Sequence, residues 1–71
     1  MKLRPRELEV ARLVRDGLSN KEIASRLHIS ESYVKLLIRD ILRVWKLRNR
    51  AHLAATIERL EPSKPNVPSV A

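Results

Sequence analysis

Cysteine is absent from the 71 residues of the sequence, so neither a disulfide framework nor a thiolate zinc site can hold the fold together. Long apolar runs are absent too. The longest has three residues, as in Leu36-Leu37-Ile38, whereas about 20 are needed to cross a bilayer, and the N-terminus has no signal-peptide pattern. These absences predict one small cytoplasmic domain that folds on side-chain packing alone and does not cross a membrane.

Arrangements of catalytic or metal-binding residues are missing as well. The two histidines, His28 and His52, fall on different predicted elements, and no serine has a histidine at a spacing that suggests a triad. The sequence offers no set of ligands that would support a metal site. It therefore predicts a protein that is not an enzyme and that needs neither a metal nor a cofactor.

Positive charge is what the sequence has in excess. Fifteen Lys and Arg residues stand against eight Asp and Glu residues, which gives a net charge of +7 and a pI of about 10.9. A surplus of this size in a small domain favours a polyanionic partner. Taken alone, the charge leaves two other interpretations open: a basic surface with no partner, and an anionic membrane surface.

Two helices are predicted in the first part of the chain. The first spans residues 5–16, with a proline in its first turn, where the missing N–H is no loss, and with Gly17 as its stop. Ser19 and Glu22 then fit a capping box, in which each side chain accepts a hydrogen bond from the other residue's backbone N–H. This pattern predicts a second helix over residues 20–27.

Two further helices follow. Only His28 and Ile29 separate the second helix from a third over residues 30–46, which Ser30 is expected to cap. Two helices joined so closely must cross at a steep angle, which is the helix-turn-helix arrangement. Asn49 is the expected cap of a fourth helix, from Arg50 to about Leu60.

The predicted fold is therefore all-α: a four-helix helix-turn-helix domain in residues 1–60. Three prolines and a lack of periodicity predict that residues 61–71 form a disordered tail. The apolar side chains expected inside the domain recur at helical spacing. They are Val10, Leu13, Val14, Ile23, Ala24, Leu27, Ile29, Val34, Ile38, Ile41, Trp45, Leu53, Ile57 and Leu60, with Leu37 and Leu42 flanking the apolar face of the third helix.

The third predicted helix has two contrasting faces. At 100° per residue, Val34, Ile38 and Ile41 share an apolar face, and the opposite face is basic and contains no acid. A helix is about 10–12 Å across, which suits a DNA major groove of similar width. The basic face thus favours duplex DNA as the polyanion. Its members are Lys35, Leu36, Arg39, Arg43 and Lys46.

The segments GLSNKEIASRLHISESYVK and ILRVWKLRNRAHLAA make the chain similar to a known family. Over about residues 3–60 it resembles the DNA-binding domain of the LuxR/FixJ/GerE-type transcriptional regulators. The resemblance implies that the second and third helices form a helix-turn-helix, that the third helix lies in the major groove, and that the fourth helix pairs two copies as a homodimer.

The same resemblance implies a role for each matching residue. Positions that face bases fall on Lys35, Leu36 and Arg39. Positions that face phosphates fall on Ser19, Asn20, Lys21, Ser30, Tyr33 and Arg43, with Lys46 as a further candidate. Positions in the dimer interface fall on Ala51, Ala54, Ala55 and Glu58, which also share one face of the fourth predicted helix. Small residues there would let a second helix approach, although alanine is also simply the best helix former.

Two departures from the family pattern carry structural expectations. Arg4 stands where the family usually has Thr or Ser, so the first helix should lack its side-chain cap, a loss of roughly 1 kcal/mol. Lys46 stands where glycine is frequent, so a left-handed backbone at this position would cost about 1 kcal/mol. Neither change removes the basic face.

Two alternatives remain open. A promoter-recognition domain like region 4 of sigma factors uses a similar helix-turn-helix and would bind RNA polymerase as a further partner. A protein-interaction module could instead keep the fold and use the alanine face of the fourth helix. Duplex DNA binding and an RNA polymerase pull-down would separate the three hypotheses.

Overall fold

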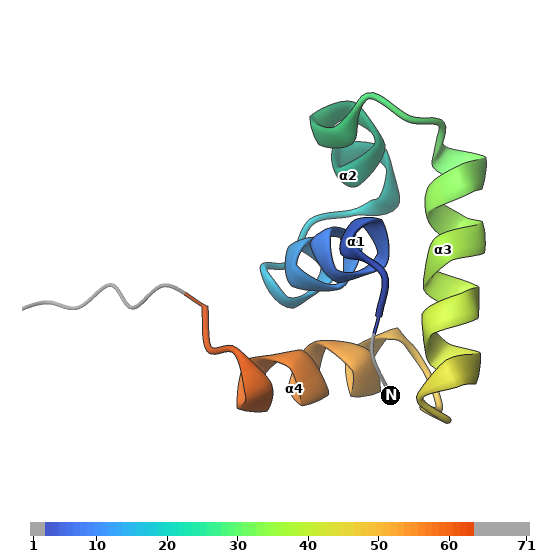
Figure 1. The fold of residues 1–71 in the computed structure, drawn as a ribbon. Helices are drawn as coiled ribbons and strands as arrows, with labels where there is room; N and C mark the ends of the chain where they lie inside the picture. The colour runs from blue at the N-terminus through green and yellow to red at the C-terminus, as the bar shows by residue number, and fades with distance from the viewer. Residues whose placement is uncertain (1–2, 64–71) are drawn as a thin grey trace, which may run out of the picture.

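A computed structural model describes residues 3–63, and within them the chain forms four helices and no strand. These are α1 (Pro5–Arg15), α2 (Asn20–Leu27), α3 (Glu31–Val44) and α4 (Arg50–Leu60). Helix α1 lies at the centre and contacts the other three, while α2, α3 and α4 are arranged around it (Figure 1). The prediction of an all-α, four-helix domain is confirmed.

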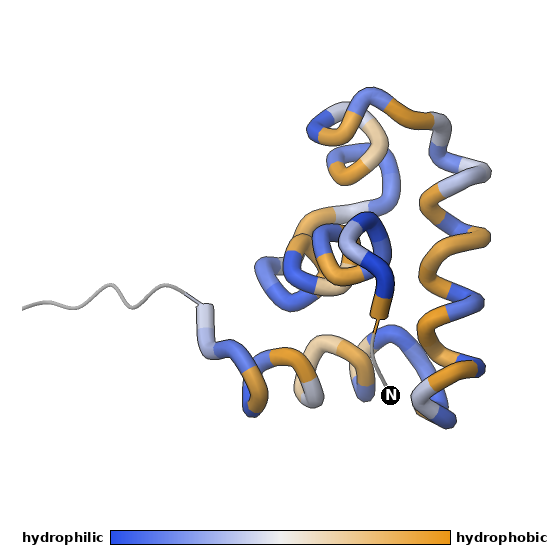
Figure 2. The backbone as a smooth tube through the Cα atoms, in the orientation of Figure 1, coloured by the Kyte–Doolittle hydropathy of each residue, from blue (hydrophilic) through white to orange (hydrophobic). Residues whose placement is uncertain are grey.

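The core is formed by apolar side chains from all four helices, and hydrophobic stretches recur along each of the four helices in the chain trace (Figure 2). The sequence pattern did not include Ala11, which is fully buried because α1 is surrounded by the other helices. The buried set is Val10, Ala11, Val14, Ile23, Ala24, Val34, Leu37, Ile38, Ile41, Leu53 and Ile57. Leu13, Leu27, Ile29 and Trp45 are partly buried against it.

The expected helix caps are present. Ser19 Oγ accepts from the Glu22 N–H at 3.1 Å, and the Glu22 carboxylate accepts from the Ser19 N–H at 2.8 Å, which completes the capping box. Hydrogen bonding of the Glu22 carboxylate to the Ser19 N–H, and then to the Ser19 side chain, lowers the pKa of Glu22. Ser30 Oγ accepts from the Tyr33 N–H at 3.0 Å, and Asn49 caps α4 in the same way.

Helix α1 has half of a capping box. The Arg4 side chain has no acceptor atom and makes no side-chain cap, as expected. Glu7, however, accepts a hydrogen bond from the Arg4 backbone N–H at 2.9 Å. One of the unpaired N–H groups at this helix start is therefore satisfied from inside the helix.

A left-handed residue follows shortly after each of helices α1, α2 and α3. These residues are Gly17 (φ 88°), His28 (φ 58°) and Lys46 (φ 54°), respectively. After α3, the Leu47 N–H donates to the Leu42 carbonyl at 2.8 Å. This is the hydrogen bond of a Schellman motif that spans the larger number of residues. The condition stated for Lys46 is met, since this residue has the left-handed conformation in which a lysine is less stable than a glycine.

The bounds of two predicted helices were too long. Helix α1 ends at Arg15 rather than at residue 16, and α3 spans Glu31–Val44 rather than residues 30–46. Ser30 is the N-cap of α3, and Lys46 lies in the turn after it. The left-handed conformation cannot continue a right-handed helix, so the apolar pattern reaches further along the chain than the helix itself.

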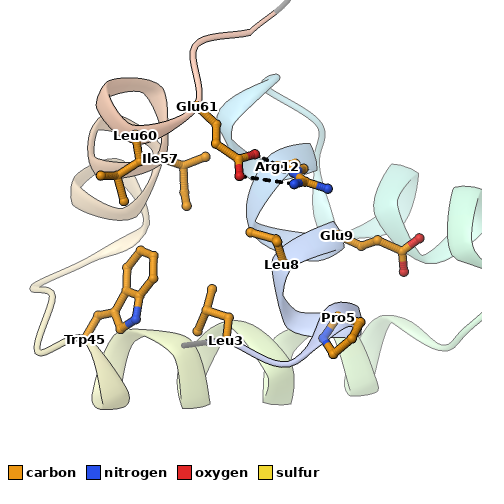
Figure 3. Close-up of a pocket in the computed structure, with 9 residues that line it drawn as sticks. All are labelled: Leu3, Pro5, Leu8, Glu9, Arg12, Trp45, Ile57, Leu60 and Glu61. Atoms are coloured by element: carbon orange, nitrogen blue, oxygen red, sulfur yellow. Dashed lines mark hydrogen bonds and ion pairs between the residues drawn. The ribbon is translucent and has the colours of Figure 1, made fainter. Parts of the chain in front are cut away.

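The chain does not leave the domain at Glu61. Glu61 Oε1 accepts from Arg12 Nε at 2.6 Å, and the Glu61 carbonyl accepts from Arg15 Nη1 at 2.6 Å, so the end of α4 is held against α1. Figure 3 shows the two hydrogen bonds between the Glu61 carboxylate and the Arg12 guanidinium. The predicted tail therefore begins later than residue 61, and its remaining part, residues 64–71, lies outside the described residues.

Leu60 was expected inside but is 62% exposed. It lies at the rim of an open apolar groove between the start of α1 and the ends of α3 and α4 (Figure 3). Leu3, Leu8 and Trp45 line the same groove. Helix α4 ends at Leu60, so no further turn covers this side chain.

Candidate nucleic-acid interface

The outer face of α3 is free of the other helices. Figure 1 shows α3 along one edge of the domain, with α1, α2 and α4 all on its inner side. Lys35, Arg39 and Arg43 are exposed, and Leu36 is 44% exposed. Four or fewer residues separate successive members of this set, so they form one ridge along the helix.

The three residues expected to face bases are brought together. Lys35, Leu36 and Arg39 line one shallow, solvent-facing hollow, which Ser32 completes. Sequence reasoning missed Ser32. Its spacing of three, four and seven residues from the other members would have placed it on the same face. The hollow thus combines two cations, one hydroxyl and one aliphatic side chain.

Arg43 continues this ridge and is paired with an acid of its own helix. Arg43 Nη2 lies 3.0 Å from Asp40 Oδ1, and its side chain is 75% exposed. An exposed pair of this kind contributes only about 0–1 kcal/mol, so a phosphate can compete for the guanidinium. The assignment of Arg43 to phosphate binding is compatible with its geometry and stays a prediction.

The first turn of α2 carries three further phosphate candidates. Ser19 is exposed, and its Oγ accepts the capping hydrogen bond from the Glu22 N–H. Asn20 Oδ1 accepts from Arg50 Nη1 at 2.5 Å, and Lys21 is exposed. Backbone N–H groups at a helix start favour anions, so this end of α2 suits a DNA phosphate.

Ser30 and Tyr33 lie at the start of α3, where Ser30 is the cap and Tyr33 is 43% exposed. Lys46 is exposed, but it lies in the turn after α3. Its placement on a continuous helical ridge is therefore wrong, whereas its use as a phosphate contact stays a prediction.

The predicted dimer face of α4 is divided in the structure. Ala51, Ala55 and Glu58 are exposed, whereas Ala54 is partly buried against the core of its own domain. Glu58 Oε1 also accepts from Ser63 Oγ at 3.1 Å. The available face therefore consists of Ala51, Ala55 and Glu58, which lie one above another at intervals of four and three residues.

Residues 1–57 match the family described as bacterial regulatory proteins, luxR family. The chain belongs to this family. It is 46% identical over 56 residues to the two-component response regulator PprB of Pseudomonas aeruginosa, a match that covers 79% of this chain and 20% of PprB. It is 54% identical over 55 residues to the nitrate/nitrite response regulator NarP of Escherichia coli, covering 78% of this chain and 25% of NarP.

Membership explains the helix-turn-helix formed by α2 and α3 and identifies this chain as a DNA-binding domain of transcription regulators. A further relative is the HTH-type transcriptional regulator AlkS of Ectopseudomonas oleovorans, 40% identical over 53 residues, which are 75% of this chain and 6% of AlkS. The chain thus spans about a quarter or less of the length of these relatives. The family is one of DNA-binding regulators and not of enzymes.

Two findings bear on other classes of site. Among residues 3–63, no cluster of His, Cys, Asp or Glu side chains is suited to hold a metal ion. In the same part of the chain, no helix has the length and apolar character needed to cross a membrane.

Proposed function

We propose that this chain binds duplex DNA in a sequence-specific manner, with α3 in the major groove, and that it does so as part of a transcriptional regulator in the cytoplasm. The observation that carries the proposal is the hollow on the outer face of α3, where Lys35, Leu36 and Arg39 lie together. A cluster of two cations and one aliphatic group on an exposed helix matches the chemistry of base edges in the major groove.

The side chains in this hollow would share the reading of bases. Arg39 or Lys35 suits O6 and N7 of guanine, and Leu36 suits the methyl group of thymine. The residues around the hollow would bind the backbone, which supplies affinity and register but little sequence information. These backbone contacts are assigned to Ser19, Asn20, Lys21, Ser30, Tyr33, Arg43 and Lys46.

We further propose that two copies bind together through α4. One domain of this size makes few base contacts, so one copy alone would discriminate poorly among sequences. A two-fold axis through the exposed face of Ala51, Ala55 and Glu58 would set two α3 helices on related half-sites. At a promoter, RNA polymerase would be a further partner, which a pull-down with the polymerase would detect.

Selection of bound sequences from a random pool of duplex DNA tests the function. The expected result is enrichment of one motif whose two halves are related by two-fold symmetry and lie about one helical turn apart. A pool that remains random after repeated rounds of selection would contradict sequence-specific binding. A motif with a single half-site would contradict the dimer while leaving the base-reading proposal intact.

A further inference from the structure

Arg50 links two helices whose backbones do not meet. It is the first residue of α4, and within the described residues α2 and α4 make no direct backbone contact. Arg50 Nη1 donates to Asn20 Oδ1 at 2.5 Å, and Nη2 donates to the Leu18 carbonyl at 2.6 Å. Both hydrogen bonds are partly buried. The guanidinium therefore spans the gap and holds the start of α2.

These two hydrogen bonds decide which way the Asn20 amide points. The guanidinium has only donors, so the oxygen of the amide must face Arg50 and its NH₂ group must face away. Phosphate oxygens only accept hydrogen bonds, so they require the NH₂ group. The Leu18 carbonyl, a second acceptor that would repel a phosphate, is also directed at Arg50. The bridge thus turns these two acceptors toward Arg50 and leaves the Asn20 NH₂ group as a donor, next to the Glu22 carboxylate that is already bound to the Ser19 N–H.

Charge adds to this effect. Both acceptors of Arg50 are neutral oxygens, so these hydrogen bonds leave the positive charge of the guanidinium uncompensated. That charge lies beside the first turn of α2, where Lys21 and the positive end of the helix dipole also lie. Glu22 places one carboxylate in the same turn, but Lys21 and Arg50 outnumber it, so the start of α2 keeps a positive charge that favours the arrival of an anion.

We propose that Arg50 is a positioning residue for DNA binding, because it holds Asn20 with its amide NH₂ directed at a backbone phosphate. This inference rests on the proposed function and names the role of a residue that the resemblance did not assign. Arg50 acts through Asn20 and connects the orientation of the phosphate-binding end of α2 to the start of the proposed dimer helix.

The test is a double-mutant cycle in the affinity for a short duplex of scrambled sequence, since backbone contacts act on any sequence. Asn20→Ala is expected to weaken binding about fivefold. Arg50→Lys should weaken binding by a similar factor, because lysine keeps the positive charge but has no guanidinium group that can donate to two acceptors at once. In the Arg50→Lys background, Asn20→Ala should then have almost no further effect. Arg59→Ala, at the other end of α4, is the control for losing one charge from the same helix.

Salt dependence and folding separate positioning from other roles. If Arg50 only positions Asn20, then the slope of log affinity against log salt stays the same in Arg50→Ala while affinity falls, whereas the loss of a direct phosphate contact would reduce the slope by about one. Unfolding in urea and helix content measured on the free proteins show whether each variant is folded. Arg50→Lys also serves as the milder change should Arg50→Ala fail to fold.

Two outcomes would overturn the proposal and are distinguishable from each other. If the two substitutions weaken binding additively, or if Arg50→Lys binds like the unaltered protein, then Arg50 does not position Asn20, and the proposed function stands. If the unaltered protein binds no duplex even at low salt, then the proposed function fails, and the role of Arg50 fails with it.

Discussion

Lys46 occupies a conformation that its side chain disfavours. Its φ of 54° lies in the left-handed region, where a residue with a Cβ atom is less stable than glycine by about 1 kcal/mol. Lys46→Gly should therefore raise the free energy of unfolding by about 1 kcal/mol, as measured by urea denaturation, less any loss from removing a cation at the end of α3. It should also weaken DNA binding slightly if Lys46 contacts a phosphate.

Gly17 provides the matched control, because it occupies the same kind of position after α1 with a φ of 88°. A Cβ atom added there would meet nothing within 4 Å, so any effect comes from the backbone conformation alone. Gly17→Ala should lower the free energy of unfolding by about 1 kcal/mol. Equal stability of Lys46→Gly and the unaltered protein would show that the turn after α3 tolerates a side chain without strain.

At the residue scale, what the sequence predicts depends on how local the interaction is. Ser19, Ser30 and Asn49 were predictable caps because each bonds an N–H three residues away. The hydrogen bond between Asn20 and Arg50 joins residues 30 positions apart, and no local pattern indicates it. Residue type and position in the sequence therefore identified the candidates for phosphate binding, but they did not predict how the side chains of these candidates are oriented.

At the scale of elements, α4 is held to α1 by an ion pair that depends on pH. Arg12 donates to the Glu61 carboxylate and thereby lowers the pKa of Glu61 below its ordinary value of 4.5. A lowered pKa in the folded state means that the contribution to stability is present above pH 4.5 and is lost as the pH falls through the folded pKa. The domain should thus lose stability on acidification.

Glu61→Gln tests this contact. The variant should be less stable than the unaltered protein at neutral pH, and the difference between the two should shrink as the pH falls below 4.5. Urea denaturation at a series of pH values measures both stabilities. Glu22, whose pKa is also lowered, stays in both proteins, so some acid sensitivity should remain. A difference that is constant with pH would contradict the role of the Glu61 carboxylate.

The helices themselves were largely predictable, whereas their ends and their partly exposed sides were less so. Hydrophobic spacing located all four helices, because each must bury one face. It placed Leu60 inside, since spacing cannot reveal that α4 stops there and leaves the groove open. It placed Glu61 in the tail, because its partners Arg12 and Arg15 lie more than 40 positions earlier in the chain.

At the scale of the whole molecule, the proposed dimer can be disrupted without touching the core. Ala55 is exposed on α4, so Ala55→Glu should leave the stability of one domain nearly unchanged. In a two-fold pair the new carboxylate would approach its own copy, and like charges repel. Sedimentation should show two copies of the unaltered protein on a duplex with two half-sites and one copy of the variant.

A duplex with a single half-site is the control for this substitution, because binding there needs no second copy yet is subject to the same change in charge. Affinity for the single half-site should be almost unchanged. If Ala55→Glu still binds as two copies with unchanged affinity, then the contact between copies does not use this face of α4.

The central claim is that the outer face of α3 reads bases, and the affinity of Arg39→Ala for a matched and a scrambled duplex tests it most directly. Lys21→Ala, which removes one charge at a predicted phosphate contact, is the comparison. We expect Arg39→Ala to lose about 1–3 kcal/mol of preference for the matched duplex, and Lys21→Ala to weaken both duplexes alike. Equal losses on both duplexes for Arg39→Ala would contradict the assignment of α3 to base reading.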